Sequence, residues 1–465
     1  MACFQEKSIK NLTIFFGTGI LMNGDMIRGY IKANKHVIIV LTSFVFGLSL
    51  YVNTSYFVSK EALRFYPPFV AGVQHTVNTM LGAEYYAIAE SLVAGTGYSN
   101  PFRTDTGPTA WQPPVYPLFL AGLLQVFPSK LFVAFTIIVL KNFILIFTGL
   151  LLYEIAKKTR LRLPAGFILI LYCLWLVCFF RWFFQFSHDE WLLLFFMNVV
   201  LIGTVLLTTN TVGYATALAW GALGGFAILT NPIAGLVWIM SSLLNALKRN
   251  TKKIIIAFFF VGVLAFPWVL RNYMVFDKII LMKSNFYFDA YHNNQTEDGI
   301  VYSDYEISEH PYSTARNDPD SLYNRVGELE FLEIYREKFR RDFSDNPKKY
   351  LKNIKNRFIA ALFKFYPYTQ HEMFVPWQSF FHALPFLSII VLMFLRRDEG
   401  NPYVLVALVM YVVYLTPYVL VSYYMRYSIP LTQVKILFIF WAIDLTVSRF
   451  SRNPEISLNQ SEVTS

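Results

Sequence analysis

The chain has few charged residues: Asp, Glu, Lys and Arg together make up 15% of its 465 residues, whereas soluble domains carry about 25%. Cysteine is scarcer still, and three residues do not make a disulfide framework. The net charge of +10 comes with no zinc-ligand spacing, helix-turn-helix signal or RNP-like motif. These absences argue against a soluble globular enzyme, a disulfide-bonded scaffold and a nucleic-acid partner.

Hydrophobic residues dominate instead, at 55%, with 18% aromatic residues. Because a spanning helix needs about 20 mostly apolar residues, the pattern predicts an all-α polytopic membrane protein with about ten transmembrane helices. A shorter apolar run at 114–127 opens with two prolines and predicts a re-entrant or interfacial helix. The predicted spans are 36–58, 131–155, 163–183, 191–208, 214–230, 232–247, 254–270, 379–395, 403–422 and 428–447.

Short basic clusters predict the orientation of these spans. They lie in the N-terminal segment and after the second, sixth, eighth and tenth spans, all on one side of a ten-span chain. The positive-inside rule makes that side the cytoplasm, so both termini are expected there. The first apolar run is too long for a signal-peptide core and lacks a small-residue cleavage site, so we expect an anchored first helix.

This topology divides the chain into five parts. No internal repeat or low-complexity tract is evident. The expected parts are a cytoplasmic segment 1–35, a transmembrane region 36–270 with an outer loop 59–130, an extracytoplasmic region 271–378 with a charged helical stretch, C-terminal spans 379–447 and a cytoplasmic tail 448–465.

The first outer loop contains the periodicity of an amphipathic helix at 74–93. Glu90 falls on its solvated face, whereas Glu84 falls at the edge of the apolar stripe. A carboxylate there is costly unless it has a partner or a chemical role. From the residues alone, an interfacial ion pair is the simpler interpretation for Glu84. The apolar stripe consists of Val77, Leu81, Tyr85, Ile88 and Leu92.

A Gly- and Pro-rich segment follows and predicts an ordered irregular loop. Its aromatic residues Tyr98, Trp111 and Tyr116 suit a belt at the membrane interface.

Several stretches, in this order, resemble one known family. An acidic residue followed by Tyr precedes A-x-S-L-x-x-G-x-G-Y and G-P-T-A-W-x-P-P-x-Y-P. Later come GGFAILTNP (224–232), PWVLRNYMVF (267–276), a segment with His-Pro, Gly-Glu and Asn-Pro pairs, and YYMRYSIPL (423–431). Together they resemble bacterial polytopic glycosyltransferases of the GT-C superfamily, the group around glycosyltransferase family 39. Two positions depart from that pattern, because Glu84 stands where the family usually has Asp, and Asn231 where it commonly has Arg.

The resemblance implies a membrane enzyme that transfers a sugar from a polyprenyl-phosphate donor to a lipid, glycan or protein acceptor, with inversion. It implies an active site on the extracytoplasmic side of the inner (plasma) membrane, in contact with membrane lipids. Glu84 is the implied catalytic base. The expected substrate-binding residues are Arg271, Arg426, Tyr85, Trp111, His188, Asp189 and Lys283.

Simpler interpretations stand beside these roles. Arg271 and Arg426 could be interface arginines whose charged ends reach water, and Lys283 a solvated lysine. His188, Asp189 and Glu190 could bind a metal or the acceptor, or simply begin a helix. No metal site is predicted, and a divalent cation is the one cofactor left open. Lys141 lies within a span and receives no role.

Two other functions fit a polytopic chain. A secondary transporter or lipid flippase would carry charges near span midpoints and a repeat with broken helices. A structural subunit of a cell-envelope complex would have no chemical need for Glu84. The polar residues gather mainly in the predicted outer segments, which favours the enzyme.

Overall fold

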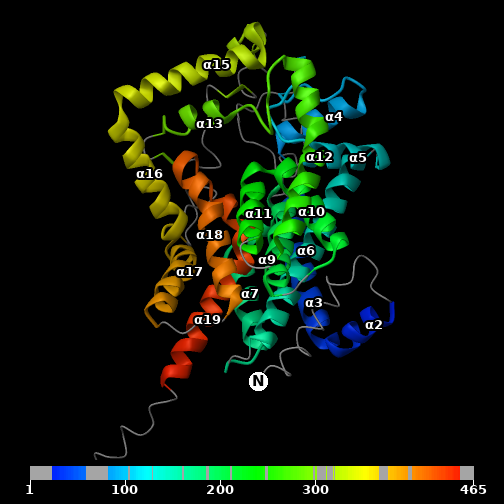
Figure 1. Ribbon diagram of the computed structural model, residues 1–465, viewed down its shortest axis with the longest axis vertical. Coiled ribbons are helices and arrows are strands. Elements are labelled where there is room, and N and C mark those ends of the chain that lie inside the picture. Colours follow the sequence, from blue (N-terminus) through cyan, green and yellow to red (C-terminus); the bar gives the residue numbers. More distant parts are fainter. Residues whose placement is uncertain are drawn as a thin grey trace, which may run out of the picture.

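The computed structural model describes residues 24–58, 82–102, 105–127, 129–159, 162–184, 188–209, 212–246, 250–296, 299–300, 310–311, 318, 320–365, 375–395 and 401–450. Over these ranges every regular element is a helix (Figure 1). The only extended pairings there are two isolated bridges, Ser99 with Pro108 and Ile300 with Tyr423. The predicted all-α class is therefore confirmed.

Apolar helices form a bundle in which residues remote in sequence share one large core. Its helices are α3 (Lys35–Val58), α6 (Lys130–Lys158), α7 (Gly166–Cys178), α8 (Phe180–Phe184), α9 (Glu190–Thr209), α10 (Tyr214–Thr230), α11 (Pro232–Asn245), α12 (Thr251–Phe276), α17 (Val375–Leu395), α18 (Pro402–Val421), η3 (Met425–Leu431) and α19 (Thr432–Phe450).

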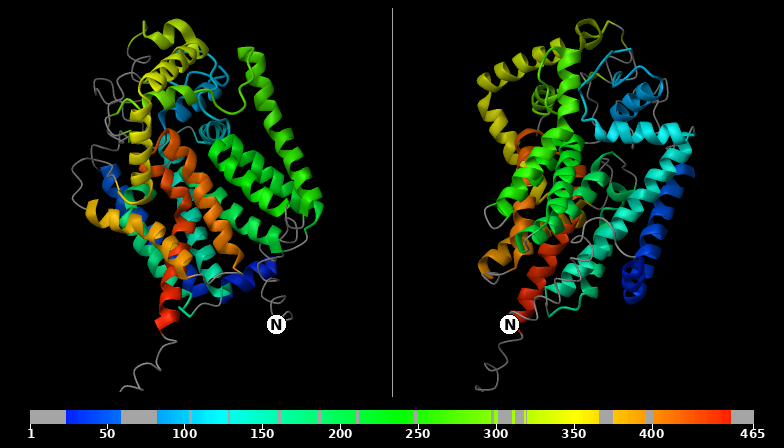
Figure 2. Two further views of the ribbon diagram at one scale, coloured as in Figure 1. Left: turned by 60° about the vertical axis from the view of Figure 1, so that its left-hand side comes forward. Right: turned by 45° about the vertical axis from the view of Figure 1, so that its right-hand side comes forward.

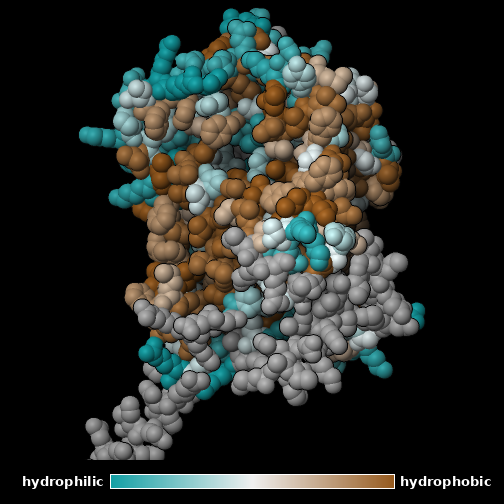
Figure 3. All heavy atoms as spheres, in the orientation of Figure 1, coloured by the Kyte–Doolittle hydropathy of each residue, from teal (hydrophilic) through white to brown (hydrophobic). Residues whose placement is uncertain are grey.

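Seven helices in the described part of the chain are long and apolar enough to cross a membrane. Their apolar side chains are also turned outward, as with Phe394, which is 82% exposed, and Phe259, at 72%. Figure 3 shows hydrophobic residues covering much of the side of the bundle, with hydrophilic residues gathered at the end that carries α15. Lipid is the solvent that such a surface requires, so the protein is a multi-pass membrane protein. The seven helices are Lys35–Thr54, Leu131–Lys158, Glu190–Thr209, Thr251–Phe276, Pro376–Leu395, Pro402–Val421 and Met425–Arg449.

Three of the ten predicted spans form apolar helices that are shorter than these seven. The run 163–183 is divided, because α7 ends at Cys178 and Phe179 leaves the helical conformation. The runs 214–230 and 232–247 form α10 and α11, of 17 and 14 residues. Asn231 separates them in an extended conformation, as expected before Pro232. Its side chain caps α11 by accepting a hydrogen bond from the amide of Ile233.

The remaining helices lie near the two ends of the bundle. They are α2 (Gly24–Ala33), α4 (Ala83–Val93), α5 (Val115–Val126), α13 (Phe286–His292), α15 (Leu322–Asp345) and α16 (Pro347–Leu362). Of these, α16 runs down beside α18. Figures 1 and 2 show α4, α13 and α15 at one end, and α2 with the last turns of α19 at the other. The predicted short helix at 114–127 is confirmed as α5, which lies across the end of the bundle in Figure 2.

We call the described parts of residues 82–114 and 277–365 the cap. Aromatic side chains from α13 and α15 pack with two rings of the loop after α4 to form its core. A second apolar cluster joins the cap to the bundle, because Ile88 and Tyr98 pack against Trp268 of α12. The aromatic core consists of Phe102, Trp111, Phe288, Tyr323, Phe331, Leu332 and Tyr335.

A fully buried arginine forms another joint between cap and bundle. Arg357 of α16 donates to the carbonyls of Val419 (2.9 Å) and Leu420 (3.0 Å) at the C-terminal end of α18. It also donates to Asn294 and Gly299 of the cap, at 3.2 Å each. The cation thus lies at the negative end of the α18 dipole and satisfies carbonyls that the helix leaves open.

Candidate functional site

Polar side chains from five separate segments meet where the cap contacts the bundle. The ring of Tyr85 lies edge-on to His188, with centroids 6.4 Å apart, and Arg426 contacts His188 directly. The charges of Arg426 and Lys283 both act on the carboxyl group of Glu84. We call this group the junction cluster. It consists of Glu84 and Tyr85 of α4, His188, Asp189 and Glu190 at the start of α9, Asn231, Lys283 and Arg426.

The start of α4 is set by Gly82, whose φ is +79°. A side chain there would be strained, and a Cβ atom would lie 2.5 Å from the ring of Tyr85. Glycine therefore allows the chain to turn sharply into α4 while the ring of Tyr85 folds back over the turn. The turn places Glu84 and Tyr85 against the first residues of α9.

Glu84 is a buried carboxylate with only 6% of the residue exposed. One oxygen accepts a hydrogen bond from the side-chain amide of Gln112, and the other lies 3.4 Å from Nε2 of His310. Burial raises the pKa of Glu84 to about 7, against the opposing effect of Gln112. Burial also lowers the pKa of His310 well below its usual value, so the ring beside Glu84 is neutral at pH 7. Glu84 can therefore gain or lose a proton near neutral pH.

The contrast between the two carboxylates of α4 follows the predicted stripe. Glu84 is buried, whereas Glu90 is partly exposed, and Ile88 of the stripe is buried as well. Burial in α4 extends beyond the predicted stripe, because Tyr86, Ala87 and Ala89 on other faces of the helix are also buried. Val77 and Leu81 of the predicted stripe lie outside the described residues.

Arg426 is held by two residues of the short segment before α9. It donates to Oε1 of Glu190 at 2.7 Å and contacts Nδ1 of His188. Its guanidinium also lies over the rings of Tyr424 and Tyr427, at 5.4 and 5.2 Å from their centroids. The arginine is thus fixed in a low-dielectric setting, where its charge acts more strongly than in water.

Asp189 is buried between Asn231 and the other charges of the cluster. Asn231 donates a long hydrogen bond of 3.4 Å to Asp189, and its amide lies the same distance from the hydroxyl of Tyr418. Burial raises the pKa of Asp189, and Arg426 opposes that rise. The neutral side chain of Asn231 adds no second cation where the resembled family commonly has Arg.

Lys283 lies at the edge of the cluster and forms an ion pair of 3.3 Å with Asp289. Both side chains are 31% exposed, so solvent screens the pair and leaves it weak. Lys283 is therefore able to exchange its partner for another anion.

Arg271 is placed differently from Arg426. Its two terminal nitrogens each donate at 2.7 Å to backbone carbonyls of the cap loop, those of Thr109 and Tyr98. The guanidinium also packs over the rings of Tyr98, Trp268 and Phe276. Through these contacts Arg271 holds the cap loop on α12. Arg271 itself lies outside the junction cluster.

The predicted belt of aromatic residues is wrong for the loop after α4. Trp111 and Tyr116 are fully buried and Tyr98 is nearly so. Trp111 lies in the aromatic core of the cap, and Tyr116 packs edge-on to Tyr85 at 5.1 Å. These rings build the wall behind the junction cluster and do not face lipid.

Glu328 is a central residue to which the sequence analysis gave no role. Its buried carboxylate accepts hydrogen bonds from the Thr109 hydroxyl, the Ala110 amide, Ser284 at 2.7 Å and Tyr323 at 3.1 Å. Gly327, with φ +76°, interrupts α15 immediately before it. Four donors satisfy the carboxylate, which therefore joins the loop around Thr109 to the second half of the cap. The Gly-Glu pair was the available signal, but three of its four partners, Thr109, Ala110 and Ser284, are more than 40 residues away.

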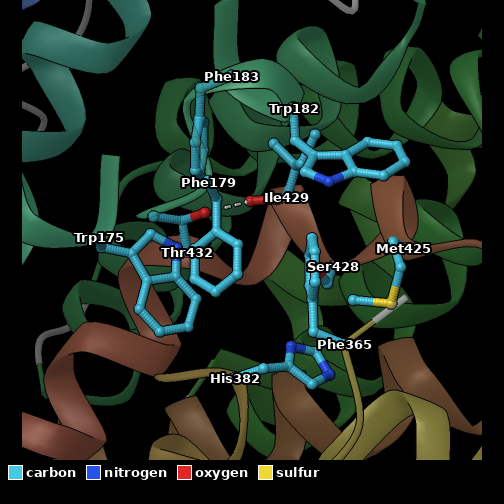
Figure 4. Close-up of a pocket in the computed structure, with 10 residues that line it drawn as sticks. All are labelled: Trp175, Phe179, Trp182, Phe183, Phe365, His382, Met425, Ser428, Ile429 and Thr432. Atoms are coloured by element: carbon cyan, nitrogen blue, oxygen red, sulfur yellow. Dashed lines mark hydrogen bonds between the residues drawn. The ribbon is translucent and has the colours of Figure 1, made fainter. Parts of the chain in front are cut away.

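Two small cavities lie below the junction cluster and share the wall formed by Trp182, Phe183 and Ile429. One lies between Lys141 and Glu190. The other is aromatic, and Figure 4 shows His382 and Ser428 facing it from below and from the right of Phe179. Each has about 10 Å³ of room, enough for about one water molecule.

No metal-binding set is apparent in the described ranges, where no three His, Cys, Asp or Glu side chains are grouped to hold an ion. His188, Asp189 and Glu190 are consecutive, and two of them contact Arg426 instead. A divalent cation is therefore assigned to none of these residues.

No family model, curated protein or solved structure matches the chain at a significant level. The function of the junction cluster must therefore be argued from its chemistry and from the sequence motifs.

The burial of Glu84 predicts a pH-dependent stability. Its pKa of about 7 in the folded protein lies above the value of 4.5 in an unfolded chain, so the folded state retains a proton as pH rises between these values. The stability that this group contributes is therefore present at low pH and lost as pH rises through 7. At pH 8 we expect Glu84→Gln to unfold at a higher temperature than the parent, with a free energy of unfolding about 3 kcal/mol larger. This difference should shrink toward pH 5.

The measurement is thermal unfolding of the detergent-purified proteins between pH 5 and pH 8. Glu90→Gln is the matched control, since Glu90 is the partly exposed carboxylate of the same helix. If the unfolding temperatures of the parent and Glu84→Gln differ by the same amount from pH 5 to pH 8, the raised pKa of Glu84 is contradicted.

Proposed function

We propose that the protein is a membrane glycosyltransferase that moves a sugar from a polyprenyl-phosphate donor to a hydroxyl of a lipid, glycan or protein acceptor. The observation that carries the proposal is a buried carboxylate, Glu84, whose pKa of about 7 suits a general base, in one cluster with a fixed arginine, Arg426. The family-like order of motifs supplies the donor class and the inverting outcome.

The reaction needs a base, a cation and a held acceptor. The acceptor oxygen attacks C1 of the sugar, its proton passes to Glu84, and the bond between C1 and the phosphate oxygen breaks. The electron pair of that bond leaves with the phosphate. A base with a pKa near the working pH is effective because it is ionised before the step and still able to hold the proton after it.

Of Arg271 and Arg426, Arg426 is the better candidate to bind the leaving phosphate. It belongs to the junction cluster, and its guanidinium offers more donors than its contact with Glu190 uses. Lys283, at the partly exposed edge of the cluster, adds a second cation that can leave Asp289 and bind the phosphate. Arg271 would act by holding the loop that carries Gln112, the partner of Glu84, since both of its terminal nitrogens bind that loop's neighbouring carbonyls.

His188, Asp189 and Tyr85 would position the acceptor on the side of Glu84 that faces α9, and Trp111 would support them from the aromatic core. The cluster lies at the end of a lipid-facing bundle, which is where a polyprenyl chain in a bilayer would present its head group. The proposed location is the inner (plasma) membrane, with the cap on the extracytoplasmic side.

A second candidate function is a transporter or lipid flippase. Lys141, His382 and Lys435 are buried inside candidate spans, which is the pattern expected of a transport path. A flippase would move the lipid across the bilayer and leave the sugar–phosphate bond intact, whereas a transferase breaks it. Release of free polyprenyl phosphate therefore separates the two functions.

The proposal predicts that Glu84→Gln lowers sugar transfer by a factor of about 10² or more. Glutamine keeps the size of the side chain but cannot accept the proton. Glu84→Asp should retain part of the activity, because it keeps the carboxylate at a shorter reach. The measurement is the initial rate with one active donor, at equal amounts of folded protein.

Glu90→Gln is the control and should transfer at the parental rate. A parental rate in Glu84→Gln as well would remove Glu84 as the base and would direct the search to Asp189 and Glu190. A structural subunit would show no dependence on any of these carboxylates.

The proposed topology predicts opposite labelling of the two ends of the molecule. Glu333 of α15 and Lys157 at the end of α6 have side chains 49% and 43% exposed, so cysteines there would be accessible. In a background without the three native cysteines, Glu333→Cys should react with an impermeant maleimide in intact cells. Lys157→Cys should react only after permeabilisation. The reverse pattern would place the cap in the cytoplasm.

A further inference from the structure

Lys141 lies in the first half of α6, inside a candidate span, and only 2% of the residue is exposed. Its ammonium donates to the carbonyl of Phe184 at 2.9 Å. Phe184 ends α8, so the contact fixes the ammonium against the segment that leads to α9. Burying a lysine inside a membrane span costs free energy, which indicates that its ammonium has a specific partner.

Glu190 lines the same cavity as Lys141. Glu190 is almost fully buried, and its two oxygens are in different situations. Oε1 accepts the hydrogen bond from Arg426, whereas Oε2 is buried with no hydrogen-bond partner among the residues that the structure describes. A buried carboxylate oxygen without a donor costs free energy comparable to a lost hydrogen bond.

The cavity has the size and lining to hold a water molecule that would be the missing donor. Its room of about 10 Å³ fits one water molecule. Trp182, Phe183 and Trp191 form apolar walls around it, and its charged lining residues are Lys141 and Glu190. A water held there would accept from the ammonium and donate to Oε2 of Glu190.

We propose that Lys141 is a positioning residue for the phosphate-binding arginine: through a water in this cavity its ammonium keeps Glu190 ionised, and Glu190 holds Arg426 in place. The role of Arg426 in binding phosphate rests on the proposed function. The link between Lys141 and Glu190 rests on the cavity that both residues line and does not depend on that function. The charges alternate along the path, with Lys141 positive, Glu190 negative and Arg426 positive.

Asp189 is buried beside Glu190, and two adjacent buried carboxylates repel each other. Lys283 acts on Asp189 from the partly exposed edge of the cluster, whereas Lys141 faces the cavity that Glu190 lines. Arg426 then stays paired with the ionised Glu190, and its remaining donors are available to a bound phosphate.

The link to Glu190 is tested by a double-mutant cycle on thermal unfolding, which requires no substrate. Lys141→Met should lower the unfolding temperature by several degrees in the parent, and by clearly less in Glu190→Gln, where the carboxylate that needs the cation is gone. An equal shift in both backgrounds would overturn the link.

The positioning role is tested by the KM for the polyprenyl-phosphate sugar. Lys141→Met should raise that KM about tenfold with a smaller change in kcat, because ground-state binding of the phosphate is weakened. Lys141→Arg should restore most of the affinity. Lys435→Met is the matched control: it removes another buried lysine of a candidate span that does not line this cavity, and should leave the KM unchanged.

An unchanged KM in Lys141→Met, or an equal rise in Lys435→Met, would refute the positioning role. If the parent transfers no sugar from any donor, the proposed function fails, and the double-mutant cycle still decides whether Lys141 and Glu190 are joined.

Discussion

The cost of removing charges from water governs this structure. Glu84, Asp189, Glu190 and Arg426 gather at one end of an apolar bundle, where the three carboxylates are almost completely buried. Each is tolerable only because another member offsets it: Arg426 neutralises Glu190, Gln112 donates to Glu84, and Asn231 donates to Asp189. The same burial raises the pKa of Glu84 to about 7 and so makes the residue chemically useful at neutral pH.

Such a cluster can exist only if the cap is held firmly on the bundle. Three charged residues do this, the buried Glu328 and Arg357 and the partly buried Arg271, each by satisfying backbone or side-chain groups of another segment. Glu328 joins the two halves of the cap, Arg271 ties the cap loop to α12, and Arg357 ties α16 to the end of α18. Glu328 and Arg271 both bind the loop at Thr109 and Ala110, just before Gln112, so they position the amide that donates to Glu84.

Local pattern predicted the helices and one important side chain. The apolar runs were recognisable because a helix in lipid needs a continuous apolar surface, and helical periodicity separated buried Glu84 from partly exposed Glu90. It did not predict that α7, α10 and α11 are shorter than the seven long apolar helices, which depends on breaks at Phe179 and Asn231. Nor did it find the pairing of Arg426 with Glu190 or the four donors of Glu328. Apart from the contact of Tyr323 with Glu328, those contacts join segments far apart in sequence, and no local signal records which residues will meet.

The central claim is that the junction cluster breaks the bond between a sugar and a lipid phosphate. Its most direct test is incubation of the purified protein in lipid with a panel of polyprenyl-phosphate sugars, with free polyprenyl phosphate measured over time. The account predicts that at least one donor releases its phosphate, by transfer or by hydrolysis, and that Glu84→Gln abolishes the release. An intact sugar–phosphate bond throughout the panel, together with movement of the lipid across the bilayer, would contradict the account and favour a flippase.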